Sequence, residues 1–111
     1  MSVRADIGGR AEADLTNQYR WYLDNAGTEV AERFLEAFHD TVARLTKHPQ
    51  LGRPRRFRAP ELGGIRSLPV GGSFGVHLVF YRAASHDLSI VRVMHGARDL
   101  PRRLLEPPEI S

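Results

Sequence analysis

The chain has 111 residues and a formal net charge of +3, and this length suits a single compact domain. It contains no cysteine, which excludes disulfides and zinc sites built from thiolates. No apolar run is long enough to cross a bilayer, and the opening MSVRADIGGR lacks the core of a signal peptide. We therefore expect a cytoplasmic protein that does not contact a membrane.

The basic side chains are almost all arginine, with fifteen arginines against one lysine. Four of them fall in GRPRRFR, from Gly52 to Arg58, which contains no acid. Arginine suits bidentate recognition of phosphate or carboxylate groups. The same bias also arises from a GC-rich genome, and a basic patch can equally bind an acidic protein.

The first half of the chain predicts a weak strand followed by two helices. SVRADI is the weak strand, since only Val3 and Ile7 favour that conformation. From Ala11 onward the apolar residues recur at helical spacing as far as Ala26, and Gly27 ends this helix. Thr28 is then expected to be the N-cap of a second helix, which Pro49 terminates. The apolar stripe of the second helix comprises Val30, Phe34, Phe38, Val42 and Leu45.

The second half of the chain predicts three strands joined by short turns. These are GIRSLPV (64–70), FGVHLVFYR (74–82) and LSIVRVM (88–94). Two successive hairpins form an antiparallel meander, and the helical stripes supply the apolar cover for one of its faces. We expect an α+β fold in one domain, residues 1–105, with a loose tail at 106–111.

Few residues predict catalysis. The five histidines are scattered without metal-ligand spacing, so we predict neither a metal nor a cofactor. No serine lies in a nucleophile elbow, and the glycines form no phosphate loop. His95 is the exception of interest, because it ends a strand beside Gly96 and Arg98.

The arginines of the second half define a candidate surface. As a set they predict a positive surface for a target or an anion more strongly than they predict catalysis. Individually, each is better explained by a salt bridge to a helix acid such as Asp14. The predicted target- or anion-binding residues are Arg53, Arg55, Arg56, Arg66, Arg82 and Arg98.

Several quoted segments, in this order, resemble the RelE/ParE family of bacterial type II toxins, and its ParE branch in particular. They are AEADL, WYLDNAGTEVAERF, LTKHPQLGRPR, IRSLPV, LVFYR and IVRVMHGARD. HPQLGRPR and RVMHGARD are the most specific, and the resemblance runs from about residue 3 to about residue 100.

The resemblance implies two alternative activities. A ParE-like protein is expected to inhibit DNA gyrase by binding, without chemistry of its own. A RelE-like protein is expected to cleave mRNA in the ribosome without a metal, and here His95, Arg66 and Arg82 would be the catalytic residues. The chain has no tyrosine after Met94, although RelE-like toxins often use one, so we favour the binding-type toxin.

The resemblance also implies a cognate ParD-like antitoxin that wraps the toxin over its helical hairpin and sheet. We expect its apolar side chains to enter a groove formed by Trp21, Tyr22, Phe34 and Phe38. Trp21 is out of phase with the helical stripe, so it should be exposed or line that groove, or else pack under the arginine loop.

Overall fold

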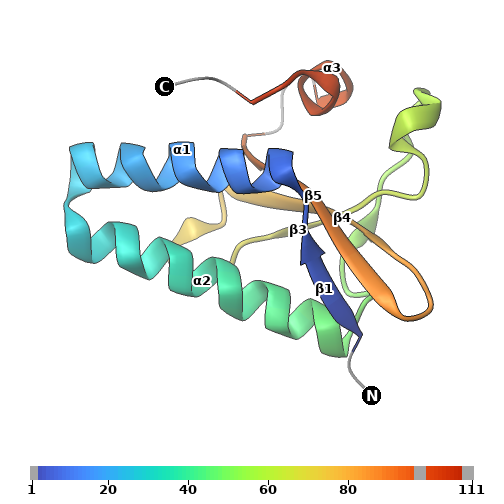
Figure 1. Ribbon diagram of the computed structural model, residues 1–111, viewed down its shortest axis with the longest axis horizontal. Helices are drawn as coiled ribbons and strands as arrows, with labels where there is room; N and C mark the ends of the chain where they lie inside the picture. The colour runs from blue at the N-terminus through green and yellow to red at the C-terminus, as the bar shows by residue number, and fades with distance from the viewer. Residues whose placement is uncertain (1–2, 97–99, 109–111) are drawn as a thin grey trace.

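A five-stranded sheet and a pair of long helices form the two main layers of the computed structural model (Figure 1). The structure describes residues 3–96 and 100–108. Along the sheet the strands follow the order β1-β5-β4-β3-β2. Their bounds are β1 Arg4–Ile7, β2 Arg53–Pro54, β3 Arg66–Pro69, β4 His77–Ala83 and β5 Asp87–His95. The α+β architecture predicted from the sequence is confirmed.

The helical hairpin consists of α1 (Gly9–Ala26) and α2 (Thr28–Lys47). Gly27 joins them with φ +95°, a conformation that favours glycine. Its N–H donates to the carbonyl of Tyr22 and its carbonyl accepts from the N–H of Ala31. The predicted N-cap at Thr28 was therefore wrong, because Gly27 is the cap residue and Thr28 is already the first helical residue.

The main core lies between this hairpin and one face of the sheet. The predicted stripe of α2 supplies Phe34, Phe38, Val42 and Leu45, all of them buried. From the sheet, Val79 and Tyr81 of β4 face the helices while Phe80 faces the opposite side. The alternation predicted for this strand is thus confirmed.

The predicted meander corresponds to β3, β4 and β5, paired antiparallel in sequence order. Pro69 lies at the end of β3, beyond the two residues that pair with β2, as expected of a residue that donates no ladder hydrogen bond. The weak first strand pairs with β5 in parallel, with Ile7 opposite Ile90. This pairing places β1 at one edge of the sheet.

A second apolar cluster covers the other face of the sheet. It contains Phe80 and Met94 from the strands, and Leu100 and Leu104 from a short helix, α3 (Leu100–Leu105). This helix was not predicted from the sequence. Pro101 lies in its first turn, where a missing N–H costs nothing.

The predicted tail at 106–111 begins where α3 ends. The carbonyl of Glu106 accepts a hydrogen bond from Arg92 of β5. Residues 109–111 lie outside the described residues. Across the described ranges, no helix combines the length and apolar character needed to cross a membrane.

Candidate functional site

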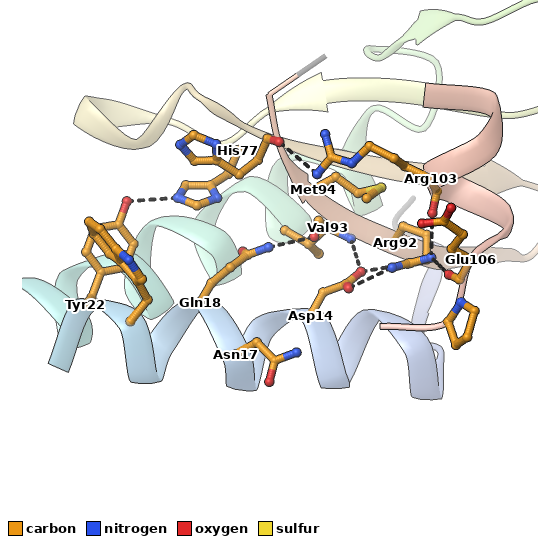
Figure 2. A pocket seen from close by; sticks show the side chains of 13 residues that line it. Asp14, Asn17, Gln18, Tyr22, His77, Arg92, Val93, Met94, Arg103 and Glu106 are labelled. Atoms are coloured by element: carbon orange, nitrogen blue, oxygen red, sulfur yellow. Dashed lines mark hydrogen bonds and ion pairs between the residues drawn. The ribbon is translucent and has the colours of Figure 1, made fainter. Parts of the chain in front are cut away.

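A cavity of about 640 Å³ lies between α1, the adjoining ends of β4 and β5, and the segment that follows α3 (Figure 2). Its walls combine polar, charged and aromatic side chains. The lining residues are Asp14, Asn17, Gln18, Trp21, Tyr22, His77, Arg92, Val93, Met94, His95, Arg103, Glu106 and Pro107.

One end of the cavity is formed by a buried ion pair between Asp14 of α1 and Arg92 of β5. The guanidinium donates from Nε to Oδ2 at 2.8 Å and from Nη2 to Oδ1 at 2.9 Å. Its Nη1 also donates to the carbonyls of Arg103, Leu104 and Glu106 at the end of α3. Arg92 is 4% exposed, so this pair joins the first helix, the sheet and the last helix.

Polar side chains of α1 hydrogen-bond to the edge of β5 beyond its pairing with β1. The N–H of Val93 donates to Asp14 Oδ2 at 2.9 Å, and Gln18 Nε2 donates to the Val93 carbonyl at 2.7 Å. Among the described residues, β1 is paired with β5 only as far as Ile90. Asp14 and Gln18 thus satisfy backbone groups that a neighbouring strand would otherwise bind.

Two histidines meet at the other end of the cavity. His77 and His95 are directly opposite in the pairing of β4 with β5, and their ring centroids are 5.2 Å apart. His77 Nε2 lies 2.8 Å from the hydroxyl of Tyr22, and the ring packs against Phe34. Burial, together with the charge of His95, lowers the pKa of His77 from 6.5 to about 4, so this imidazole is neutral at pH 7.

The four residues predicted for the antitoxin groove separate into two pairs. Trp21 is 59% exposed and lines the cavity, and Tyr22 lines it beside Trp21. The placement of Phe34 and Phe38 in a groove is corrected by the structure, since both are 0% exposed. They pack between the helices and the sheet, so a partner reaches neither without opening the core.

The predicted arginine surface is distributed over both faces of the sheet and the loop before β3. Arg53 of β2 and Arg56 of the loop that follows it are both exposed. Arg55 is half-buried near the rings of Phe57 and Phe80, and burial together with Arg53 lowers its pKa. Arg98 lies outside the described residues.

Arg66 and Arg82 hold loops of the protein itself. Arg66 donates to the carbonyls of Gln50 and Gly52, whereas Arg82 donates to those of Gly63 and Glu61. Arg66 is paired with Tyr81, on the helix-covered face. Because neighbouring residues of a strand face opposite sides, Arg82 lies on the other face.

The alternative catalytic set of His95, Arg66 and Arg82 is therefore not brought together. His95 lies opposite His77, five residues from Arg82 along β4, which is roughly 17 Å at the rise of a strand. The cavity that His95 lines contains neither Arg66 nor Arg82. In the described ranges, no three side chains of the metal-binding types form a group that could hold an ion.

The cavity itself was not predicted from the sequence. Its walls come from α1, β4, β5 and the residues around α3, and no single segment shows a motif. Gln18 and His77 carry no sequence signal beyond their positions in a predicted helix and a predicted strand. Charge is the one available signal, since the sequence predicts a salt bridge between an arginine and a helix acid such as Asp14.

The order of an N-terminal strand, a helical hairpin and a sheet packed on it agrees with the fold of small bacterial toxins that the resemblance implies. Residues 7–100 match the family model described as "ParE toxin of type II toxin-antitoxin system, parDE". The chain therefore belongs to the ParE toxin family of type II toxin–antitoxin systems.

Curated relatives and a solved structure agree with this membership. The chain is 30% identical to "Toxin ParE1" of Mycobacterium tuberculosis over 94% of its own length and 100% of the relative's. It is 31% identical to "Toxin RelE3" of Caulobacter vibrioides, over 82% and 91% of the two chains. A chain from the structure titled "Chromosomal ParDE TA system from P. aeruginosa" shares the fold, with a TM-score of 0.69 at 21% identity, over 86% of this chain and 98% of the other.

Proposed function

We propose that this protein is a binding-type toxin that inhibits DNA gyrase and is neutralised by a cognate ParD-like antitoxin. Membership of the ParE family over residues 7–100 carries this proposal. The separation of His95, Arg66 and Arg82 supports it, because metal-free RNA cleavage requires cations and a proton-transfer group around a single phosphate. The protein would then act by occupying its target, without a reaction of its own.

The exposed arginines supply the part of the surface best suited to that target. Arg53 lies in β2 and Arg56 in the loop that follows it, and both belong to the segment GRPRRFR, which contains no acid. A gyrase–DNA complex presents both phosphates and acidic side chains, which arginine binds in a bidentate manner. Charge reversal at these two positions should raise the concentration needed to inhibit gyrase, while the free energy of unfolding changes little.

A supercoiling assay with purified gyrase tests the proposal. The wild-type protein should inhibit supercoiling or stabilise cleaved DNA, whereas the double variant Arg53→Glu, Arg56→Glu should need a higher concentration for the same effect. Lys47→Glu, on the exposed end of α2, is a single charge-reversal control, to be compared with each of the two arginine changes made alone. A lack of effect at large molar excess of wild-type protein would count decisively against gyrase as the target.

The antitoxin should cover the cavity and bury Trp21. A large exposed aromatic residue at the rim of a concave site is typical of a binding hot spot, and acids of the partner would complement the basic surface. Trp21→Ala should weaken the complex at least about tenfold, the effect typical of a hot spot. Leu51→Ala, at another exposed apolar position, should leave the affinity unchanged.

One specific observation favours the RelE-like alternative: the chain is 31% identical to Toxin RelE3. This alternative predicts cutting of translated mRNA at codon boundaries and loss of cutting in His95→Ala or Arg82→Ala. Mapping mRNA ends after induction distinguishes the two activities. Intact mRNA with filamentation and DNA-damage signalling agrees with the gyrase proposal, whereas codon-phased cuts would replace it.

A further inference from the structure

Two buried polar atoms of the cavity have no hydrogen-bond partner among the described residues. They are Oε1 of Gln18 and Nδ1 of His77. His77 is only 3% exposed, and the two side chains approach the cavity from α1 and from β4 (Figure 2). Buried polar atoms are normally hydrogen-bonded, so these two indicate where a bound group belongs.

The contact of Gln18 fixes its Oε1 as an acceptor, and the role of Nδ1 of His77 follows from the tautomer assigned to that ring. Gln18 donates through Nε2 to the Val93 carbonyl, so its Oε1 is an acceptor. Burial raises the pKa of Tyr22, so the phenol keeps its proton, and we assign to His77 the tautomer in which this proton is donated to Nε2. The neutral imidazole then carries its own proton on Nδ1, which is a donor.

We propose that this cavity is a recognition site for a primary carboxamide. The carbonyl of such a group accepts from Nδ1–H of His77, and the N–H on the same edge donates to Oε1 of Gln18. Trp21 and Tyr22 line the same cavity and give the planar group an apolar wall. A carboxylate would set its oxygens against Oε1 of Gln18, and an aliphatic group would leave both atoms without a partner.

The natural occupant, on this view, is an asparagine or glutamine side chain of the antitoxin. This part rests on the proposed function, because it places the antitoxin over Trp21. It adds a chemical requirement to that docking: one amide side chain of the antitoxin enters the cavity, while the surrounding contacts are apolar or acidic.

Three small aromatic probes test the site on the full chain: benzamide, N-methylbenzamide and benzoate. The methyl group of N-methylbenzamide leaves its N–H and carbonyl on opposite edges, so it cannot bridge Gln18 and His77. Benzamide should bind about tenfold more tightly than either of the others, the cost of leaving a buried partner unsatisfied. Trp21 is the only tryptophan of the chain, so its fluorescence reports binding, and ¹⁵N shifts of the imidazole report the proton on Nδ1.

Two variants connect that preference to the two atoms. Gln18→Met keeps the length of a half-buried helical side chain, and His77→Phe keeps a buried ring; each should abolish the preference for benzamide. His39→Phe, at an exposed position of α2, should retain it. Circular dichroism establishes that each variant is folded, and Gln18→Met alone decides the test if His77→Phe does not fold.

The outcomes separate this inference from the proposed function. Equal binding of the three probes, tighter binding of benzoate, or a site filled by water only would overturn the carboxamide site and leave gyrase inhibition untouched. Wild-type antitoxin affinity in both Gln18→Met and His77→Phe would do the same. A selective benzamide site in a protein without effect on gyrase would instead sustain the site and remove the proposed target.

Discussion

Asp14 and Gln18 lie one helical turn apart on α1, and both hydrogen-bond to the backbone of Val93. Their surroundings differ. Asp14 and Arg92 engage each other bidentately, and Arg92 also binds three carbonyls at the end of α3. Gln18 and His77 each keep one buried atom without a partner among the described residues. One turn of helix thus separates a structural anchor from a group that can still bind.

Neighbouring positions on one face of α1 therefore have different roles: one stabilises the fold and the other retains unpaired polar atoms. A saturated ion pair contributes rigidity, since breaking it leaves a buried charge. Two polar atoms without hydrogen-bond partners contribute little to stability, but each can still bind a partner.

Asp14→Ala should have the largest effect. It leaves the buried guanidinium of Arg92 without its carboxylate and the N–H of Val93 without its acceptor, which should lower the free energy of unfolding by about 3–5 kcal/mol. Urea denaturation measures the loss. The double variant Asp14→Leu, Arg92→Met should be less destabilised than Asp14→Ala if the unpaired charge is the cause, and equal loss would contradict that reading.

Acid should destabilise the protein through His77. Its pKa in the folded protein is about 4, below the ordinary 6.5, so the neutral form favours folding. The resulting stability is fully present above pH 6.5 and is lost as the pH falls from 6.5 toward 4, by at most about 3 kcal/mol before solvent screening in an open cavity. Denaturation of wild type and His77→Phe across this range measures it; parallel curves would exclude His77 as the source.

The hydroxyl of Tyr81 is a neutral group with all its hydrogen bonds made, in contrast to His77, and Tyr81→Phe removes it. The buried Tyr81 hydroxyl donates to the Pro49 carbonyl at 2.9 Å and accepts from the Gly52 N–H at 2.7 Å. Removing this hydroxyl leaves both backbone groups without a hydrogen-bond partner. The free energy of unfolding should fall by about 1–3 kcal/mol. Thermal unfolding tests this, with Tyr19→Phe as the control at a hydroxyl that bonds an exposed Glu32.

Glu106→Ala should have the smallest effect. Its carboxylate pairs with Arg102 at 2.7 Å on the surface, and such i, i+4 pairs contribute about 0.3–0.5 kcal/mol. Its backbone carbonyl, which binds Arg92, remains in place. The change in the urea midpoint should therefore be near the limit of detection, and a loss approaching that of Asp14→Ala would mean that the α3 anchor depends on this side chain.

The sequence predicted those parts of the fold that periodicity specifies. The stripe from Val30 to Leu45 and the alternation around Val79 each encode one element and its buried face. The parallel pairing of β1 was not predicted, because Val3 and Ile7 reveal nothing about a partner near residue 90. Helix α3 was missed because six residues with a proline and two arginines resemble a loop.

The candidate site was harder to predict than the fold. Phe34 and Phe38 belong to a stripe that packs on the sheet, so they could not also face a partner, whereas Trp21 could be assigned outward because it breaks the pattern. The arginines gave charge without position: Arg66 and Arg82 lie on opposite faces and hold their own loops. The cavity depends on long-range packing, which local pattern does not contain.

The bond between Asp14 and Arg92 links positions 78 residues apart, and within residues 3–96 and 100–108 β1 pairs only with β5. During synthesis the N-terminal strand and helix therefore emerge from the ribosome long before the segment that completes them. A nascent chain cannot close its sheet until β5 has been translated, and it cannot anchor α3 to Arg92 until residue 106 has been translated. In a ParE-family chain built in this way, the walls of the cavity come together only after the first and the last of the segments that form them have both been made.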